Sequence, residues 1–426
     1  MNLFNFKKID KKVIIGALAI MLAAFFWSLD GVFIRPQFYI LPAALVVFLE
    51  HLLGGIMLSP FIFTSWQKIK QLSRKSWGAI LWVCVFGGVI GTIAITKAFF
   101  AAFAGETSFA TVILLQKLQP IFALVMASLI LKEKLKPKFY LWAVIAIVAG
   151  YVLAFGKTGL SLTGVNIFHH AAFFAVIAAF AFGSSTVFGK RIVNHLDFGT
   201  TAALRFAITS VLVFIIIVFT GDIFKMGQVS SLQWQLLVVI MLTSGAVAMF
   251  IYYFGLRRVT ASTATITELF WPFSAIILDF VINGNTLNTI QIIATMVLLV
   301  SFYQVVAEGK VRGLKFKAVV ISGKGRGKRI GFPTANLDRV DLDIPHGVYL
   351  VEAKINGKVH NSLLHFGFKE TFDEKPSLEV YIGNFKNDIY GKVLKVKVIK
   401  KIREVIKFKS IKELKTQIQK DLKELK

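Results

Sequence analysis

The chain has 426 residues, of which 56% are hydrophobic and only 17% are charged, and its mean hydropathy is +0.69. These values exclude an ordinary soluble globular protein. The 49 Lys and Arg against 23 Asp and Glu give a formal charge of +26, which fits nucleic-acid binding, anionic lipid or membrane topology. The single cysteine, Cys84, excludes a disulfide framework and a cysteine-based metal site.

The first three quarters of the chain consist of apolar runs, each near the roughly 20 residues that span a bilayer as a helix. Short connections separate the runs and leave no room for a soluble domain. The sequence therefore predicts a bundle of ten transmembrane helices. Their approximate ranges are 13–34, 39–64, 77–101, 107–131, 139–156, 166–188, 199–220, 232–255, 260–282 and 287–306.

Basic residues alternate between the predicted loops, with sixteen on one side of the membrane and three on the other. Positively charged short loops stay in the cytoplasm. We therefore expect a multi-pass protein of the cell membrane whose N-terminus, residues 1–12, and C-terminus are both cytoplasmic. The sixteen are Lys7, Lys8, Lys11, Lys12, Lys68, Lys70, Arg74, Lys75, Lys132, Lys134, Lys136, Lys138, Lys190, Arg191, Arg257 and Arg258, and the three are Arg35, Lys157 and Lys225.

The two halves of this region resemble each other. A shift of 152 residues lays the fourth predicted helix on the ninth, so that Pro120 meets Pro272. Five helices per copy is an odd number, so the copies must be inverted with respect to the membrane. The sequence predicts two inverted five-helix repeats, residues 13–156 and residues 166–306.

Two short motifs accompany this arrangement. The fourth helix ends in Leu-Lys-Glu-Lys-Leu, residues 131–135, and the fifth contains Ala149-Gly150-Tyr151. With ten helices in two repeats, residues 13–306 resemble the EamA type of the drug/metabolite transporter superfamily. The resemblance implies a secondary transporter with a central cavity between its repeats, and it implies no particular substrate.

Polar side chains within membrane spans are costly and often functional. Gln116 and Gln119 share one face of the fourth helix, and Glu268 and Trp271 share the aligned face of the ninth. Two such faces predict a cavity of amides and an aromatic ring, which suits a flat heteroaromatic substrate. The residues predicted to line the transport cavity are Gln116, Gln119, Glu268, Trp271, Asp30, Glu50, Lys97 and Arg205.

A structural interpretation of the same residues stays open. A shift of 155 residues places Glu50 on Arg205, and Glu50 could pair with Arg205 or with Lys97 only to neutralise buried charge. In that case Trp271 simply packs.

The composition changes after Tyr303. A polar linker, residues 307–313, leads into residues 314–426, where runs with period-2 or β-branched character alternate with turn signals. Asn356-Gly357 predicts a hairpin turn. The last seventeen residues predict an amphipathic helix with Ser410 as its N-cap. The whole chain is thus expected to be a multi-domain membrane protein, in which a small antiparallel β-barrel with a C-terminal helix follows the α-helical bundle.

The segment from Ser322 to Asn336 combines four glycines with four basic residues and ends in Gly-Phe-Pro-Thr-Ala-Asn. Glycine lets backbone N–H groups approach an anion, and nearby cations help to hold phosphate. The segment is not a Walker A loop, because no Gly-Lys-Ser/Thr ends it. By itself a basic run of this kind is more often a solvated loop or a nucleic-acid tail, but an apolar turn with hard oxygen ligands is unexpected in such a tail.

These residues closely resemble riboflavin kinase. The Gly-Arg-Gly and Gly-Phe-Pro-Thr-Ala-Asn signature is followed in order by Gly347-Val-Tyr349, Ser377-Leu-Glu379-Val, Tyr390-Gly391 and a segment from Arg403 to Asp421. The resemblance implies a six-stranded antiparallel barrel with a C-terminal helix. It also implies transfer of the γ-phosphoryl group of ATP to the terminal ribityl hydroxyl of riboflavin, which gives FMN.

The resemblance assigns roles to individual residues. Thr334 and Asn336 would be ligands of Mg²⁺, which prefers a few hard oxygens together with phosphate. Glu379 would be the base that deprotonates the hydroxyl. The alternatives are ordinary turn residues at 334 and 336 and an outward-facing strand residue at 379. The residues expected to surround the ATP phosphates are Gly323, Gly325, Arg326, Gly327 and Lys328.

The chain departs from the family pattern in one segment, His365 to Phe372, which keeps the family's Gly and Thr-Phe but lacks its Pro. This departure leaves turnover rate and flavin affinity in question. The adenylyltransferase domain that often precedes the bacterial kinase is also missing from the sequence.

The favoured function is riboflavin uptake through the membrane part, followed by trapping as FMN in the cytoplasm. The alternative is an EamA-type exporter of an unrelated metabolite or of FMN, to which a flavokinase or flavin-sensing domain is tethered. The expected partners are a small flavin and the lipid bilayer, with no nucleic acid, and a homodimer is compatible with the sequence. Residues 1–310 and 311–426 each carry +13, which fits cytoplasmic loops in the first part and a phosphate-handling domain near anionic lipid in the second.

Overall fold

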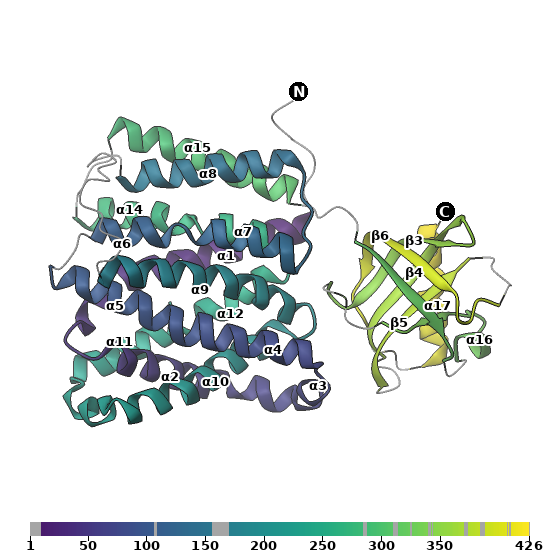
Figure 1. Cartoon of the computed structure of the whole chain (residues 1–426), viewed down its shortest axis with the longest axis horizontal. Coiled ribbons are helices and arrows are strands. Elements are labelled where there is room, and N and C mark those ends of the chain that lie inside the picture. Colours follow the sequence, from purple (N-terminus) through teal and green to yellow (C-terminus); the bar gives the residue numbers. More distant parts are fainter. Residues whose placement is uncertain are drawn as a thin grey trace. The chain divides into compact units, whose positions relative to one another are not determined.

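The computed structural model divides the chain into two compact units, Met1–Lys310 and Val311–Lys426, and each is described by itself. The first unit is helical and the second is a β-barrel with helices (Figure 1). The prediction for Gly325 lies outside the residues that the structure describes, as does most of segment 1–12. The described residues are 10–105, 109–155, 170–283, 288–309, 314–323, 326–339, 342, 344–369, 374–383, 388–406, 408 and 410–425.

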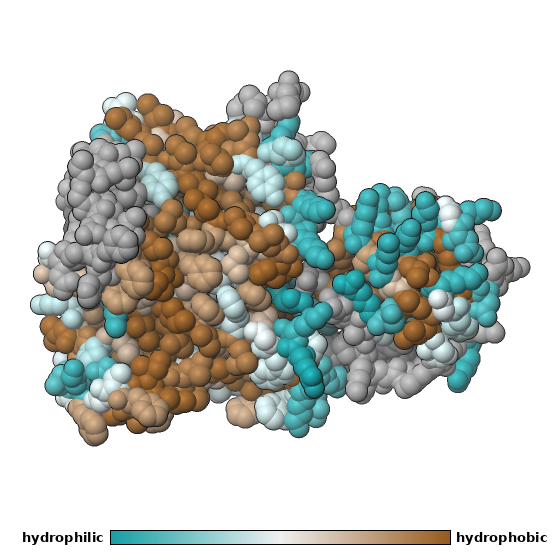
Figure 2. Space-filling view, viewed as in Figure 1, coloured by the Kyte–Doolittle hydropathy of each residue, from teal (hydrophilic) through white to brown (hydrophobic). Residues whose placement is uncertain are grey.

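The helices of the first unit present apolar side chains outward. Leu129 is 71% exposed and Phe219 is 87% exposed, and apolar residues cover most of the visible face of this unit (Figure 2). Such a surface is expected where lipid surrounds the protein. The helices are α1 Lys11–Leu29, η1 Asp30–Ile34, η2 Arg35–Phe38, α2 Ala43–Thr64, α3 Trp66–Lys70, α4 Arg74–Trp82, η3 Val83–Ile90, α5 Gly91–Phe103, α6 Phe109–Gln116, α7 Gln119–Ile130, α8 Pro137–Phe155, α9 His170–Val193, α10 Phe198–Phe219, η4 Asp222–Gln228, α11 Ser231–Leu242, α12 Ala246–Leu256, α13 Ala261–Thr267, α14 Phe270–Asn283 and α15 Thr289–Glu308.

Seven helices in the described part of the chain are long and apolar enough to cross a membrane, so the chain is a multi-pass membrane protein. The predicted count of ten spans is not reached by this measure. The fourth and ninth predicted runs are each split in two, into α6 and α7 and into α13 and α14, and the fifth contributes the shorter apolar helix Pro137–Leu153.

A proline explains each split. Pro120 and Pro272 have no N–H to donate to the carbonyl group four residues earlier, which belongs to Gln116 and to Glu268 respectively. The α-helical path is interrupted just after Gln116 and at Glu268. Both interruptions fall at the residues that the sequence singled out for a cavity.

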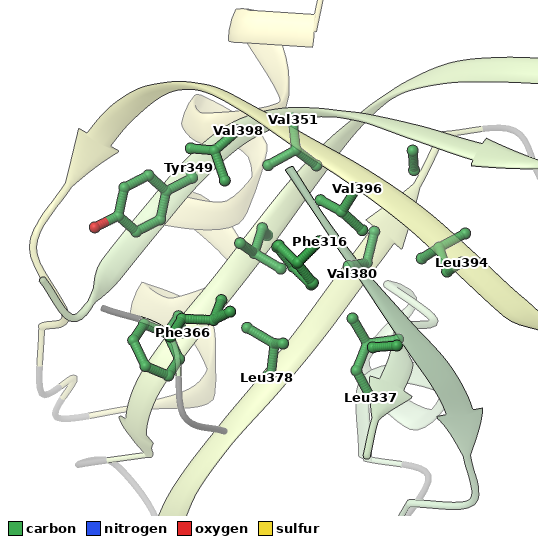
Figure 3. Packing of buried hydrophobic residues seen from close by; sticks show 14 of the residues in the cluster. Phe316, Leu337, Tyr349, Val351, Phe366, Leu378, Val380, Leu394, Val396 and Val398 are labelled. Carbon is green, nitrogen blue, oxygen red and sulfur yellow. The ribbon is translucent and has the colours of Figure 1, made fainter. Parts of the chain in front are cut away.

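The second unit is a closed antiparallel barrel with the strand order β1-β2-β5-β4-β3-β6. Alternate residues point inward, as in β3, where Val351 and Ala353 are fully buried. The inward side chains of all six strands form one apolar core (Figure 3). The strands are β1 Lys315–Ile321, β2 Ala335–Leu337, β3 Gly347–Ile355, β4 Lys358–Lys369, β5 Glu374–Ile382 and β6 Val393–Arg403, and the helices are α16 Arg326–Ile330, α17 Ile411–Leu422 and η5 Lys423–Leu425.

The predicted barrel with a C-terminal helix is confirmed. The hairpin between β3 and β4 turns at Asn356-Gly357, with φ of +48° and +81°, and positive values at both residues are what the Asn-Gly pair favours. Ser410 caps α17, because its hydroxyl accepts a hydrogen bond from the Glu413 backbone N–H at 3.2 Å. Five of the strands, β1, β3, β4, β5 and β6, fall on the runs KFKAVVIS, GVYLVEAKI, HNSLLHF, SLEVYIGNF and KVLKVKVIKKI, which have the period-2 or β-branched character that predicts strands. The sixth, β2, is only three residues long and lies inside the Gly-Phe-Pro-Thr-Ala-Asn motif.

The C-terminal helix is fixed to the barrel by an ion pair. Asp421 on α17 is 4% exposed and accepts hydrogen bonds from Nε of Arg403 at 3.0 and 2.9 Å. Nη2 of Arg403 lies 2.8 Å from the same carboxylate, and Gln417 donates to it at 2.9 Å. This pairing joins the last residues of β6 to the last turn of α17.

Removing this carboxylate should destabilise the second unit. We expect Asp421→Ala to lower its free energy of unfolding by about 3 kcal/mol, because Arg403 is then left partly buried without its partner. Pulse proteolysis of the purified full chain in urea measures the change. The control is Glu424→Ala, which breaks an exposed pair with Lys400 and should cost less than about 1 kcal/mol. Equal losses in the two variants would contradict the docking role of Asp421.

Candidate functional sites

A cavity of about 220 Å³ lies inside the helical unit, where the interrupted helices meet α1, α2, α9, α10 and α12. Seven of the eight residues predicted for a transport cavity line it: Asp30, Glu50, Gln116, Gln119, Arg205, Glu268 and Trp271. The eighth, Lys97, is not among the lining residues. Its side chain is exposed, and its Nζ lies 5.2 Å from the centre of the Phe174 ring.

Glu268 is the centre of a hydrogen-bond network in this cavity. Gln119 Nε2 donates to one carboxylate oxygen at 2.6 Å, and the Tyr252 hydroxyl donates to the other at 2.7 Å. Gln116 Nε2 in turn donates to Gln119 Oε1 at 2.8 Å. Thr186 completes the group with a 2.9 Å bond to the Tyr252 hydroxyl. The network joins the two interrupted helices through uncharged donors.

Lys117 and Trp271 form a second contact between the same helices. Lys117 follows the end of α6, and its Nζ lies 4.5 Å from the centre of the Trp271 ring on α14. An ammonium group over an indole face is a favourable cation–π contact. One face of Trp271 therefore does more than pack against apolar neighbours, since it faces a buried cation in the cavity.

Asp30, Arg35 and Glu50 form a buried ionic cluster at the end of the first span. Arg35 pairs with Asp30, and its Nη1 lies 2.5 Å from Glu50 Oε1. Asp30 begins the π-helical turn η1, in which residues five apart are bonded, and this turn places Arg35 above Asp30. Glu50 therefore pairs with Arg35, and not with Arg205 or Lys97, the two partners that the structural interpretation had left open.

The position of Arg35 differs from the one predicted for it in the membrane topology. The sequence places it in an outer loop, but it is 8% exposed and lines the cavity. Its position just before Pro36, at the end of an apolar run, resembled a loop. The signal that could have identified it was its spacing from Asp30 together with the acidic residue of the next helix.

The second unit brings the predicted kinase residues together around β2. This short strand pairs with β1 on one side and with β5 on the other, so Asn336 lies opposite Ile321 and opposite Glu379. Thr334, just before β2, donates a hydrogen bond from its hydroxyl to the Glu379 carboxylate at 3.2 Å. Thr334, Asn336 and Glu379 are all partly exposed, so a ligand can reach them.

The glycine-rich segment borders the same place. A Cβ added to Gly323 would collide with the Asn336 side-chain amide, and one added to Gly327 would lie 3.1 Å from the Thr334 hydroxyl. The predicted loop is partly helical, because α16 begins at Arg326. Lys328 lies in the same short helix. Four of the five residues predicted to surround phosphates are thus in the described structure, and the two glycines among them contact the predicted metal ligands.

Close packing at Gly323 yields a test of the site. We expect Gly323→Ala to lower kcat/KM for FMN formation by about 100-fold, because the new methyl group displaces the Asn336 amide and small displacements of a site cost this much. Steady-state kinetics of the purified full chain measures it. Gly383→Ala is the matched control, since its methyl group would meet only Leu425 at 3.8 Å. Equal activity of the two variants would show that FMN formation does not depend on the position that the Asn336 side chain takes beside Gly323.

The fold and the cavity define a multi-pass membrane protein whose chamber is lined by apolar and aromatic residues with a set of buried polar and charged ones, followed by a β-barrel domain. Residues 14–155 and 169–307 match the model of the EamA-like transporter family, and residues 311–426 match that of riboflavin kinase. The chain belongs to the EamA-like transporter family and carries a C-terminal riboflavin kinase domain.

Individual relatives match one unit each. The riboflavin transporter ImpX of Fusobacterium nucleatum is 39% identical over 291 residues, which are 68% of this chain and 97% of that protein. The bifunctional riboflavin kinase/FMN adenylyltransferase of Bacillus subtilis is 46% identical over 114 residues, and this chain spans only 36% of its length. The riboflavin kinase of Homo sapiens is 35% identical over 116 residues, which cover 75% of that protein.

Proposed function

We propose that the chain carries riboflavin across the membrane and phosphorylates it to FMN, which traps the vitamin. The observation that carries the proposal is the union, in one chain, of a unit 39% identical to a riboflavin transporter with a riboflavin kinase domain. Phosphate adds negative charge, and a charged molecule crosses an apolar phase poorly. The kinase reaction would therefore keep the imported flavin from leaving.

The chemistry of the cavity supports a flavin as substrate. Trp271 and Trp27 offer aromatic faces, and Gln116 and Gln119 offer amide donors and acceptors. Flat heteroaromatic molecules are bound by aromatic contact and by a few polar groups at their edge. The isoalloxazine ring of riboflavin has both features.

The kinase residues fit ATP and Mg²⁺. Thr334 and Asn336 offer the hard oxygen donors that Mg²⁺ prefers, and Gly323 leaves beside Asn336 a space that a side chain would fill. Bound ATP with Mg²⁺ would supply the phosphoryl group and offset its charge. Gly325, Gly327, Arg326 and Lys328 are proposed to complete the phosphate contacts.

Glu379 is proposed as the base. In this role its carboxylate accepts the proton of the terminal ribityl hydroxyl while that oxygen bonds to the γ-phosphorus of ATP and ADP leaves. The hydrogen bond from Thr334 to Glu379 holds the carboxylate beside the proposed metal ligands. The base and the proposed metal site are thereby fixed by one contact.

The helical unit is further proposed to consist of ten spans in two inverted repeats, residues 13–156 and residues 166–306. Counterparts in the two copies lie side by side: α2 beside α10 and α8 beside α15 (Figure 1). The two interrupted helices, the fourth and the ninth, both border the cavity. These pairings support a pseudo-two-fold axis in the membrane plane.

The proposed orientation follows from the basic loops. Residues 1–12, the linker 307–313 and the kinase domain 314–426 are placed in the cytoplasm, because sixteen basic residues lie on that side of the ten-span arrangement. Burial of Arg35 leaves two of the three basic residues assigned to the opposite side, Lys157 and Lys225, which strengthens the asymmetry. The ATP supply of the cytoplasm is then available to the kinase.

Proteoliposomes with the kinase domain facing inward test the proposal. With ATP and Mg²⁺ inside and labelled riboflavin outside, label should accumulate as FMN above the outside concentration. Without ATP, riboflavin should only equilibrate. If riboflavin enters at the rate of protein-free liposomes while the detergent-solubilised chain makes FMN, the transported molecule is another metabolite and the kinase is merely tethered to its carrier.

A further inference from the structure

Several polar atoms that line the cavity are buried without a partner. Among the described residues they include Oγ of Ser185, Nε of Arg205, Oγ of Ser244 and Oγ1 of Thr265. Buried polar groups nearly always have a hydrogen-bond partner, and an unpaired one is costly. The molecule that occupies the cavity is therefore expected to supply hydrogen-bond partners for these atoms.

Arg205 is the charged member of this group, and it differs from Arg35. Arg35 contacts two carboxylates, whereas no carboxylate in the described structure lies within ion-pair distance of Arg205, which is 8% exposed. Nη2 of Arg205 donates to the Gly87 carbonyl oxygen at 3.0 Å, and Nη1 lies 3.4 Å from the Tyr253 hydroxyl. Its buried Nε has no hydrogen-bond partner among the described residues, and the residue lines the cavity.

Ser185 lies at the same place, 4% exposed on α9. A Cβ added to Gly87 would collide with the Ser185 hydroxyl and would lie 3.3 Å from Nη2 of Arg205. The Ser185 hydroxyl and the Arg205 guanidinium group therefore both lie close to Gly87, where the hydroxyl occupies the place that a side chain of residue 87 would take. Both residues line the cavity, and both groups can donate hydrogen bonds.

We propose that Arg205 and Ser185 form the subsite that binds the carbonyl oxygens of the pyrimidine ring of the flavin. This inference rests on the proposed function. An arginine can only donate, so it matches a group that only accepts, and a hydrogen bond from a charged donor is about twice as strong as a neutral one. The ribityl hydroxyls, which also donate, instead match the acceptors Gln116 and Glu268.

The charge balance of the cavity favours an uncharged ligand over a phosphorylated one. Three acidic and three basic side chains line it, so their formal charges cancel, and the carboxylates of the Arg35 cluster would repel a phosphate dianion. FMN should therefore bind more weakly than riboflavin. The six side chains are Asp30, Glu50, Glu268, Arg35, Lys117 and Arg205.

Uptake kinetics of the full chain in ATP-free proteoliposomes test the subsite. We expect Ser185→Ala to raise KM for riboflavin by about 10-fold and Arg205→Gln by about 10- to 100-fold. Ser184→Ala is the matched control. It lies on the same helix and is also buried, but its hydroxyl already donates to the Ala181 carbonyl oxygen at 2.9 Å and it does not line the cavity. Its KM should match that of the wild type.

Substrate analogues separate binding from folding. In 2-thio- and 4-thioriboflavin, sulfur, a weak acceptor, replaces one carbonyl oxygen, so the wild type should prefer riboflavin to at least one of them by about 10-fold. Arg205→Gln should lose that preference.

A wild type that takes up the three flavins equally well, or an unchanged KM for riboflavin in Ser185→Ala and Arg205→Gln, would overturn the subsite while the proposed transport stands. Competition by FMN that exceeds riboflavin and depends on Arg205 would overturn the carbonyl assignment. Failure of the wild type to take up riboflavin would overturn the proposed function and the subsite with it.

Discussion

Glu379→Gln should lower kcat for FMN formation about 1,000-fold and leave riboflavin entry unchanged. Glutamine keeps the shape of the side chain and can still accept the hydrogen bond from Thr334, but it cannot accept the proton of the ribityl hydroxyl. General-base catalysis of this kind contributes about 10²- to 10⁴-fold. In proteoliposomes that contain ATP and Mg²⁺, flavin extracts separated by chromatography should show FMN only with the wild type. The variant should equilibrate free riboflavin.

A matched substitution controls for general damage to the barrel. Glu352 lies on β3 and pairs with Lys397 of β6 at 2.9 Å, so it is not on β1, β2 or β5, the strands that carry or border the proposed site. Glu352→Gln should retain wild-type FMN formation. Wild-type turnover in Glu379→Gln would exclude Glu379 as the base. Loss of riboflavin entry in the same variant would instead show that the two halves work only together, contrary to a kinase that acts after transport.

The kinase site was accessible from sequence because its parts are short motifs of fixed residue type. Thr334 and Asn336 lie two positions apart, so their proximity follows from the chain itself. Glu379 lies 45 positions after Thr334 in the sequence. Its place beside Thr334 and Asn336 depends on the pairing of β5 with β2. No local pattern identifies β2, since three residues within a Gly- and Pro-containing motif show no usable alternation. The resemblance to riboflavin kinase suggested a role for Glu379, and the strand register places this residue opposite Asn336.

In the membrane half, the prediction of side-chain contacts from sequence is limited by the assumption of regular helix geometry. Helical periodicity placed Gln119 and Glu268 on facing surfaces, and they are hydrogen-bonded at 2.6 Å. Periodicity assumes 3.6 residues per turn, however, and the π-helical turn after Asp30 breaks that assumption. The sequence left open a pairing of Glu50 with Arg205 or Lys97, and neither option included Arg35, which lies next to this turn and pairs with Glu50. Tyr252 was missed because an aromatic residue in an apolar span gives no sign that its hydroxyl is used.

Glu268→Gln should reduce kcat/KM for riboflavin uptake by about 10- to 100-fold. The carboxylate accepts from Gln119 and from Tyr252 at once, whereas a glutamine presents its amide N–H₂ group to one of these donors. Hydrogen bonds to a charged group contribute about 1.5–3 kcal/mol each, and 1.4 kcal/mol is a factor of ten. Initial rates of labelled riboflavin entry into ATP-free proteoliposomes measure the loss. Trp271→Ala, which removes the ring beneath Lys117, should act in the same direction.

Glu308→Gln is the control for the loss of a buried carboxylate. Glu308 ends α15, is 4% exposed and pairs with Lys136 at 3.0 Å, and it does not line the cavity. Its substitution should weaken the fold without changing KM for riboflavin. If Glu268→Gln and Glu308→Gln lower uptake equally and both leave KM unchanged, the Glu268 network serves stability and not the substrate. A rise in KM confined to Glu268→Gln would instead mean that the bound flavin contacts Glu268 itself or the donors that this carboxylate positions, because a purely structural role would not change substrate binding selectively.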